Sequence, residues 1–447
     1  MESGATESSC FLQYTRLRKI VDFGNAEIKK QLHSPLSTLH TQRKRGFLKM
    51  LTLDKVYHAS YVLKDVIRPT DMIKATNLAD DFELYLKTEN LQITGAFKAR
   101  GAYYKISQLS DEERAKGVIA CSAGNHAQGV ALAASKYGIK SLICMPDSAP
   151  ISKVEATKSY GAEVCLVEGT YDDAHDKAVE LQQQTGATFI HPFDDELVIA
   201  GQGTIGLEIL QQLADVDAII VPIGGGGLIS GVAFAVKSLN PNVKIYGVQS
   251  SGAPSMYISM AQGHIETLPS VNTFADGIAV KTPGELTFDI CSHYVDEIMT
   301  VTDDETATAI LSLIEKQKLI SEGAGAVSVA AALFNKFPLK GKKVCCLVSG
   351  GNIDVTILSR VIDRGLQKTG RLSEFTVALT DKPGELNTVS KIISKLGANV
   401  VAVSHDRADL NTDINSCYLR LSLETRNHEH IQKIKDELAR HGYKIVQ

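Results

Sequence analysis

The 447-residue sequence contains no tryptophan, few aromatic residues (6%) and no marked excess of charge, with 51 acidic against 47 basic side chains. A net charge of −4 gives no basic footprint for phosphate backbones or anionic lipid, so nucleic acid and membrane surfaces are poor candidates for the main partner. Hydrophobic residues make up 44%, which is ordinary for a folded chain with a sizeable core. At about 100 to 200 residues per domain, the length predicts several domains, and small polar molecules are the ligands that fit best.

Cysteines with metal-ligand spacing are also absent. The eight cysteines include no Cys-x-x-Cys pair and no spacing that would place ligands around a zinc ion. Several stand in apolar runs, among them Cys121, Cys345 and Cys346, where cysteine behaves as a small buried hydrophobe. This usage predicts a reducing compartment and a cytoplasmic protein.

One uncharged stretch, residues 218–236, is long enough to cross a bilayer. Pro222, the glycines at 224–227 and Gly231 would break a helix there. The stretch therefore predicts a strand, a loop and a buried helix instead of a membrane span.

No secretory signal is visible at the N-terminus. Residues 1–50 differ in texture from the rest and predict a poorly ordered extension. Residues 28–53 carry basic side chains and no acid, so a mitochondrial presequence is the alternative. The acids nearer the start of the chain, such as Glu2 and Glu7, count against that alternative.

Residues 87–364 alternate short apolar runs, glycine-rich turns and segments of helical period, a pattern typical of an α/β protein with parallel sheets. A compact βαβαβ subdomain is predicted at about 115–195. Its expected strands are 117–121, 141–145, 163–167 and 188–191, and its expected helices are 126–137, 152–160 and 171–185. Further strands are expected at 218–223, 244–249 and 343–348, and a helix at 303–319.

The pattern of apolar residues changes again near Arg371. Residues 375–379 alternate like a half-buried strand, 381–384 have turn chemistry, and 386–396 have the apolar spacing of a helix. Two more strands, a helix over 428–441 and a final strand complete a ferredoxin-like βαββαβ module. The predicted division is an extension at 1–50, a catalytic domain at 51–370 and a separate domain at 372–447.

The strongest chemical signal is the run Gly224-Gly225-Gly226-Gly227-Leu228, where a predicted strand passes into a helix. Ordered glycine costs about 0.5 to 1 kcal/mol of backbone entropy relative to alanine, so four in succession require a reason. A cup of backbone N–H groups around a phosphate supplies one, and a tight turn under close packing is the alternative. The turn is interpreted as an anion site.

Residues 201–206 read Gly-Gln-Gly-Thr-Ile-Gly and match a dinucleotide-binding fingerprint by letter. No convincing strand-to-helix unit frames them, so a nicotinamide or flavin site is a weak interpretation. A Walker A sequence is absent as well. A phosphate cup without nucleotide motifs favours a small phosphorylated cofactor such as pyridoxal phosphate, which requires a lysine. Lys98 stands in a glycine-flanked stretch that would let the backbone approach a ligand, although a surface lysine is the alternative.

With these motifs in place, the sequence resembles the serine/threonine dehydratase family of pyridoxal-phosphate enzymes, which has the tryptophan-synthase β-type fold. The resemblance spans roughly residues 59–365 and rests on four motifs in the family's order. These are the lysine motif at 94–102, the asparagine loop at 122–126, the phosphate cup at 224–228 and the Ser-Gly-Gly-Asn turn at 349–352. Ala96 departs from the usual serine, which puts one polar contact near the cofactor in doubt. The stretch at 199–204 also fits this family, which removes the dinucleotide interpretation.

The resemblance implies roles for particular residues. Lys98 would bind the cofactor covalently and then remove the Cα proton as general base, and Phe97 would pack against the cofactor ring. Asn125 would hydrogen-bond the ring hydroxyl, and Ser349 the pyridine nitrogen. The remaining implied contacts are Gly224, Gly225, Gly226, Gly227 and Leu228 with the phosphate, and Ser122, Gly124, Asn125 and His126 with the substrate.

The implied reaction is ammonia release from L-threonine, giving 2-oxobutanoate, and from L-serine, giving pyruvate. A neutral Ser349 partner does not enforce a protonated pyridine, which favours loss of the β-hydroxyl over transamination. Serine racemase is the nearest alternative, but the serine that it uses as an acid on the opposite face is Ala123 here. Gln249 and Ser255 stand where that enzyme has carboxylates, so no dedicated magnesium site is expected.

The segment from about Glu374 resembles an ACT domain, with residues 381–386 in the place of that family's ligand loop. Such domains pair edge to edge and bind amino acids, so regulation by an amino acid and a homodimer or homotetramer are expected, with a purely dimerising module as the alternative. A catalytically silent amino-acid sensor and a nicotinamide oxidoreductase remain alternatives from other classes.

Overall fold

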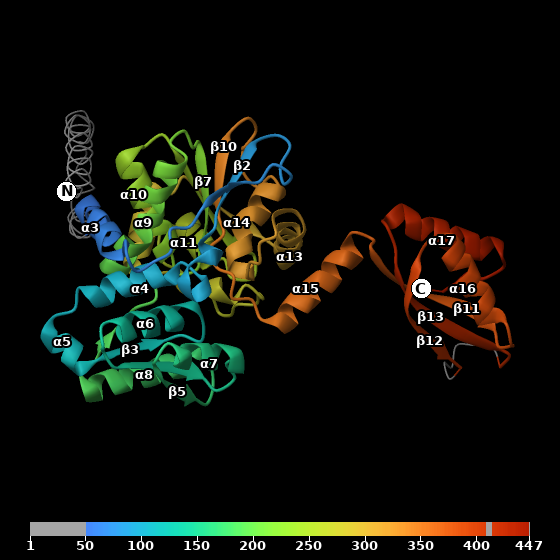
Figure 1. Cartoon of the computed structure of the whole chain (residues 1–447), viewed down its shortest axis with the longest axis horizontal. Helices are drawn as coiled ribbons and strands as arrows, with labels where there is room; N and C mark the ends of the chain where they lie inside the picture. Colours follow the sequence, from blue (N-terminus) through green and yellow to red (C-terminus); the bar gives the residue numbers. More distant parts are fainter. Residues whose placement is uncertain (1–50, 408–413, 447) are drawn as a thin grey trace, which may run out of the picture. The chain divides into compact units, whose positions relative to one another are not determined.

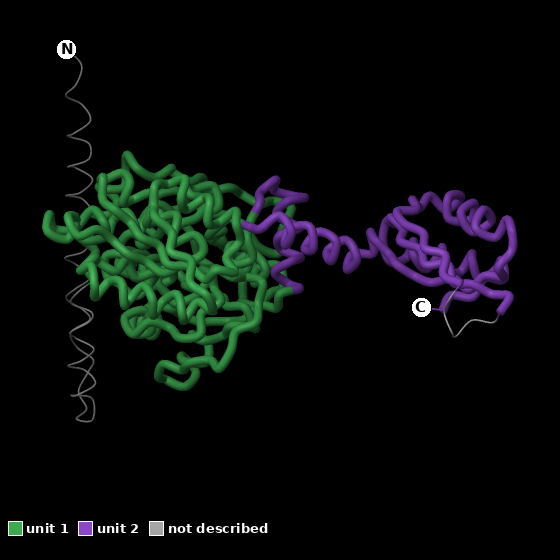
Figure 2. Tube along the Cα trace, turned by 90° about the horizontal axis from the view of Figure 1, so that it is seen from below, with its two compact units in different colours: residues 1–303, 321–352 green, residues 304–320, 353–447 purple. Residues whose placement is uncertain are grey.

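The computed structural model describes residues 51–407 and 414–446, so the predicted extension at 1–50 lies outside the described residues. The chain divides into two compact units (Figure 2). The first comprises Met1–Asp303 and Ser321–Asn352, and the second comprises Asp304–Ile320 and Ile353–Gln447.

The first unit contains two sheets, seen with their helices in Figure 1. The larger has the strand order β1-β2-β10-β7-β8-β9 and is parallel except for β1. The smaller is wholly parallel, in the order β5-β4-β3-β6. The strands are β1 Met72–Lys74, β2 Glu83–Lys87, β3 Val118–Cys121, β4 Ser141–Pro146, β5 Glu163–Val167, β6 Thr188–Phe189, β7 Ala218–Pro222, β8 Lys244–Ser250, β9 Glu297–Val301 and β10 Lys343–Leu347.

Helices cover both sheets of this unit. They are α3 Leu53–Leu63, α4 Lys98–Ser107, α5 Asp111–Lys116, α6 Asn125–Lys136, α7 Ile151–Ser159, α8 Tyr171–Thr185, α9 Glu196–Gln212, α10 Gly227–Leu239, α11 Ser255–Gln262, α12 Glu285–Tyr294 and α14 Gly323–Leu333. Three short 3-10 turns are η3 Glu89–Leu91, η4 Ile93–Gly95 and η5 Asp276–Ile278.

The central strands of the larger sheet are buried on both faces. Every residue of β7 is buried, and its sequence Ala-Ile-Ile-Val-Pro is a continuous apolar run, as parallel strands under two helical layers require. Helices α9 to α12 contribute side chains to the core cluster on one face, and α14 packs on the other. The predicted α/β class with two parallel sheets is confirmed, and the predicted strands and helices between 117 and 191 are present within a few residues of the expected bounds.

The uncharged stretch at 218–236 forms the predicted strand, loop and buried helix. Strand β7 ends at Pro222 and helix α10 begins at Gly227, with the glycine turn between them. Among the helices of the described residues, none combines the length and the apolar composition that crossing a membrane requires.

The second unit contains the predicted βαββαβ module. Its sheet has the order β12-β13-β11-β14 and is antiparallel throughout. Along β11, buried residues alternate with more exposed ones, so one face of the sheet packs on the helices. The elements of this unit are α13 Asp303–Ser312, the π-helical turn η6 Leu313–Gln317, α15 Val355–Lys368, β11 Leu372–Thr380, α16 Glu385–Lys395, β12 Asn399–Asp406, β13 Ser416–Glu424, α17 His428–Arg440 and β14 Lys444–Ile445.

Candidate active site

Lys98 begins helix α4, directly after a strained turn. Thr94, in the preceding η4 turn, has a φ of 63°, a conformation that non-glycine residues adopt only at a cost. The Lys98 Nζ donates a 2.7 Å hydrogen bond to the Pro192 carbonyl and lies 5.3 Å from the centroid of the Phe97 ring. Burial lowers the pKa of Lys98 to about 8, although the charge of Glu322 acts to raise it. The amine can therefore lose its proton near neutral pH, as a nucleophile or general base must.

The segment of Lys98 lies against the turn that contains Ser349. The Phe97 N–H donates to the Ser349 carbonyl at 3.1 Å, and Ala96 forms an isolated bridge with Gly350. The Ser349 side chain is buried, and among the described residues its Oγ makes only a long 3.4 Å contact with the Ala324 carbonyl. The fold thus brings together two predicted site segments that lie far apart in the sequence, with a hydroxyl free to take a better partner.

The asparagine loop connects β3 to the N-terminus of α6. Asn125 donates a 2.7 Å hydrogen bond to Glu322 Oε1 and accepts one of 2.8 Å from Asn352 Nδ2. The N–H of Gly124 donates to Ser122 Oγ at 3.2 Å. This loop stands at the start of a 12-residue helix, where the helix dipole favours an anion such as a substrate carboxylate.

His126 directs its imidazole away from the solvent. Its Nε2 lies 2.8 Å from the Ile190 carbonyl, and its Nδ1 is one of the buried polar atoms without a partner among the described residues. Burial and the charge of Lys98 lower the pKa of His126 to about 3, so the ring remains neutral. Any contact of His126 with a carboxylate would then come from its backbone N–H, because the ring already faces Ile190.

The glycine cup lies between β7 and α10. Gly226 has a φ of 101°, in the region that favours glycine. A Cβ on Gly225 would lie 2.4 Å from the Phe193 ring, and one on Gly227 would lie 2.8 Å from the Phe193 carbonyl oxygen. Close packing thus accounts for these glycines, and the same tight turn leaves bare backbone at the N-terminus of a 13-residue helix. Such an N-terminus fits a phosphate group.

Three functional candidates were not selected from the sequence. Glu322 is 5% exposed and caps α14, and burial, reinforced by the charge of Asp276, raises its pKa to about 7. Asn352 joins Asn125 to the carbonyl of Thr94. An acid before a glycine indicates a helix cap as readily as a site residue, and Glu322 caps α14 while its carboxylate accepts the hydrogen bond from Asn125. The third, Phe193, packs on the glycine cup and has no sequence signal of its own.

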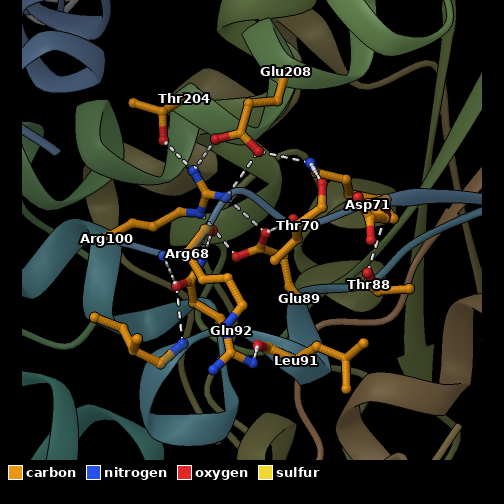
Figure 3. A network of polar contacts seen from close by, with 12 residues as sticks. Arg68, Thr70, Asp71, Thr88, Glu89, Leu91, Gln92, Arg100, Thr204 and Glu208 are labelled. Carbon is orange, nitrogen blue, oxygen red and sulfur yellow. Dashed lines mark hydrogen bonds and ion pairs between the residues drawn. The ribbon is translucent and has the colours of Figure 1, made fainter. Parts of the chain in front are cut away.

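A buried ionic network holds helix α4 just beyond Lys98 (Figure 3). The Arg100 guanidinium lies between Glu89 and Glu208 and donates to both carboxylates at 2.5 to 2.9 Å. Lys87 Nζ donates to Glu208 at 2.6 Å, and Thr70 donates to Glu89 at 2.5 Å. The side chains of Arg100 and Glu89 are fully buried, so the network fixes the start of the helix that presents Lys98.

The stretch at 201–206 lies inside α9, not at a strand-to-helix turn. A Cβ on Gly201 would lie 2.6 Å from the Cα of Gly101 in α4, and one on Gly231 of α10 would lie 2.3 Å from the Ile199 carbonyl oxygen. These glycines allow the three helices to approach backbone to backbone. The rejection of the dinucleotide fingerprint is therefore confirmed for a physical reason.

Comparison with known proteins adds to this geometry. The family model described as "Pyridoxal-phosphate dependent enzyme" matches residues 63–350. The chain is 49% identical over 398 residues to the L-threonine ammonia-lyase of Thermotoga maritima, covering 89% of this chain and 99% of that protein. Among solved structures, it resembles threonine deaminase isoform 2 from Solanum lycopersicum (40% identity, TM-score 0.67, 72% of this chain and 88% of that one). It also resembles maize serine racemase (38% identity, TM-score 0.67, 71% and 99%).

Proposed function

The chain belongs to the family of pyridoxal-phosphate-dependent enzymes, and we propose that it releases ammonia from L-threonine, and also from L-serine. The single observation that carries this proposal is the Lys98 amine, which has a pKa of about 8 and lies among the turns that would hold the cofactor. The family assignment agrees with the L-threonine ammonia-lyase that is 49% identical over most of this chain.

Each predicted site residue has a part in the proposed reaction. Bound pyridoxal phosphate supplies an electron sink for negative charge at the substrate Cα. Lys98 Nζ accepts the Cα proton, and the loop from Ser122 to His126 holds the substrate carboxylate at the N-terminus of α6. Asn125, fixed by Glu322 and Asn352, orients the cofactor ring. The turn from Gly224 to Leu228 holds the phosphate, and Ser349 takes the pyridine nitrogen, for which its weakly engaged hydroxyl is available.

The groups that could reprotonate the substrate Cα decide between elimination and racemisation, and they favour elimination. Reprotonation from the face opposite Lys98 requires an acid there, and the residue after Ser122 is Ala123, which has no such group. Although maize serine racemase is among the similar structures, we propose that loss of the β-hydroxyl dominates.

The experiment that tests the proposal combines an absorption spectrum with the release of 2-oxo acid. The purified protein should show the visible band of a lysine-bound cofactor and should form 2-oxobutanoate from L-threonine and pyruvate from L-serine. Lys98→Ala should lose the band and the activity, whereas Lys116→Ala, on the exposed surface of α5, should retain both. A band without oxo acid would favour a racemase or an amino-acid sensor, and oxo acid formation by Lys98→Ala would refute the role of Lys98.

We further propose that the module at 372–447 regulates the enzyme by binding an amino acid, and that the protein is a cytoplasmic homodimer or homotetramer. A cavity of about 380 Å³ beside the 381–386 loop supports a small ligand. Strand β12 is an edge of its sheet and is mostly exposed, which supports edge-to-edge pairing of two copies. Calorimetric titration of the full chain with branched-chain amino acids, serine and threonine tests the ligand. The absence of heat from all of them would leave a purely dimerising module.

A further inference from the structure

Three potential metal ligands meet at one end of the C-terminal sheet. Asp381 directly follows β11, His405 lies on β12, and Cys417 lies on β13, the strand between those two. Cys417 is paired with Leu379 of β11, and His405 is paired with Leu419. Because Leu379, Cys417 and Leu419 are all buried on the helix-covered face, the register places the three ligands on that same face.

The distances between their donor atoms match a single bound ion. The His405 Nε2 lies 2.8 Å from the Cys417 Sγ and 3.9 Å from Asp381 Oδ1, and the donor atoms of all three lie within 4.8 Å of one another. Zinc binds sulfur at about 2.3 Å and nitrogen or oxygen at about 2.0 to 2.2 Å, so its ligands are separated by roughly 3 to 4 Å. Entry of the ion would require the imidazole to move away from the sulfur by roughly 1 Å and the Cys417 thiol to release its proton to the solvent, because zinc binds the thiolate.

The donor types select among metals. A thiolate, an imidazole and a carboxylate together suit Zn²⁺, whereas Mg²⁺ and Ca²⁺ require oxygen ligands. Cys417 is 1% exposed, and Asp381 and His405 are exposed, so an ion could enter from the solvent and end against the buried sulfur. All three residues also line the cavity of about 380 Å³ beside the 381–386 loop, which leaves room for a fourth ligand.

Arg407 already forms an ion pair with the Asp381 carboxylate. Its Nε lies 2.9 Å from Asp381 Oδ2, and its Nη2 donates to Oδ1 at 3.1 Å. The Arg407 side chain is 67% exposed, so releasing Oδ1 to an ion costs little. The Arg407 guanidinium thus balances the charge of the Asp381 carboxylate. A bound ion can share that carboxylate with Arg407 or displace Arg407 from it.

From this arrangement, we propose that Asp381, His405 and Cys417 form a three-ligand site for Zn²⁺ in the C-terminal unit, with the fourth position open to the cavity for water or a donor atom of a small ligand. The cysteine spacing in the sequence predicts no zinc site, because zinc motifs are recognised by pairs of ligands that lie a few residues apart in the chain. Here the ligands come from three strands, and only the strand register brings them together. The proposal does not depend on the reaction at Lys98.

The test uses the full-length, cofactor-loaded protein, freed of metal with a chelator and titrated with Zn²⁺ and, separately, with Co²⁺. We expect one tightly bound Zn²⁺ per chain and a Co²⁺ spectrum with a thiolate charge-transfer band and strong tetrahedral bands. His405→Gln and Cys417→Ser should each weaken Zn²⁺ binding by at least about tenfold and should reduce or abolish the charge-transfer band.

Matched controls separate this site from other thiols and imidazoles. Cys165→Ser, in β5, and His441→Gln, on the exposed end of the α17 segment, should bind Zn²⁺ and Co²⁺ as the parent does. His405→Gln changes an exposed side chain and should keep the parent's circular dichroism, so its loss of metal cannot be attributed to unfolding. Zn²⁺ binding of equal affinity in His405→Gln, or a Co²⁺ spectrum without thiolate absorption in the parent, would refute the site. The same titration of Lys98→Ala should be unchanged, which separates this proposal from that of the catalytic lysine.

Discussion

The two units differ in where they place charge. In the first unit, the side chains of Arg100 and Glu89 have no exposed surface and meet at 2.7 Å. In the second unit, ion pairs such as Arg440–Glu437 lie at the surface, with the arginine side chain 74% exposed. Lys98 thus begins a helix that a buried ionic network holds, whereas ion pairs such as Arg440–Glu437 in the C-terminal unit are open to water.

This difference has consequences for how each site responds to change. Breaking a buried ion pair leaves a charge without a partner or solvent, whereas an exposed pair contributes about 0 to 1 kcal/mol. The surroundings of Lys98 are therefore fixed tightly by the fold. An ion can replace Arg407 as the partner of Asp381 in the cluster with His405 and Cys417 at little energetic cost. Reversible binding requires such a small cost.

The largest expected effect comes from Arg100→Met, which removes the cation shared by Glu89 and Glu208. Lys87 still pairs with Glu208, whereas Glu89 is left with the hydrogen bond from Thr70 and the more distant charge of Lys87. We expect the free energy of unfolding to fall by about 3 to 5 kcal/mol. Urea titration followed by circular dichroism measures it.

Arg440→Gln is the matched control for Arg100→Met, because it removes an exposed arginine from an ion pair of the other unit. It should change the free energy of unfolding by no more than about 0.5 kcal/mol. Equal losses in the two variants would mean that burial does not distinguish these charges.

A smaller effect is expected from Gly225→Ala in the glycine cup. The new Cβ would lie 2.4 Å from the Phe193 ring, so the turn or the ring must shift. Overpacking of this kind costs about 1 to 3 kcal/mol, which predicts that the Kd for pyridoxal phosphate rises roughly 5- to 150-fold. Equilibrium dialysis of the cofactor measures the change. Lys116→Ala, on the exposed surface of α5, should leave the Kd unaltered, and an equal rise in both variants would contradict the steric account.

The smallest effect concerns pH. The reacting form of Lys98 is the neutral amine, so attachment of the cofactor should accelerate as the pH rises toward the pKa of about 8 and level off above it. His126 and His191, whose pKa values are lowered to about 3 and about 4, remain neutral over this range. Glu322, with a pKa of about 7, ionises within it and acts to raise the pKa of Lys98.

Glu322→Gln should therefore shift the attachment profile to lower pH. Between about pH 7 and 8 the rate should exceed that of the parent by roughly two- to fivefold, a modest gain because the effective dielectric in proteins is about 20. Well above pH 8 the two rates should converge, because the Lys98 amine is then neutral in both proteins. At pH 6 the two should converge, since Glu322 is then largely protonated. Stopped-flow absorbance of the two proteins at matched pH values cancels the titration of the cofactor itself, and identical profiles would exclude Glu322 as a partner of Lys98.

The sequence predicted most of the fold because local patterns coincide with the elements. Strand β5 and helix α8 have the predicted bounds, since Gly161 and Gly186 end the helices around them. The helix expected at 303–319 instead passes from α13 into a π-helical turn that ends at Gln317, a change of period that apolar spacing does not reveal.

The residues of the candidate site could be predicted only where they belong to a recognisable sequence motif. Lys98 and Ser349 have distinctive neighbours in the sequence, whereas Phe193 and Asn352 act through contacts that depend on the whole fold. The assigned roles of the site residues and the domain bounds at 370–372 remain predictions. The proposed zinc ligands could not be predicted, because they meet through the register of three strands.

The close contact of α4, α9 and α10 at Gly101, Gly201 and Gly231 has one further consequence. Because an added Cβ at any of these positions would meet main-chain atoms of the neighbouring helix, the spacing between the lysine-bearing helix and the helix that follows the glycine cup depends on the lack of a side chain at all three. An engineer who wishes to change what this enzyme accepts therefore has a fixed reference frame, and variation belongs in the loops around it, while these three positions stay as they are.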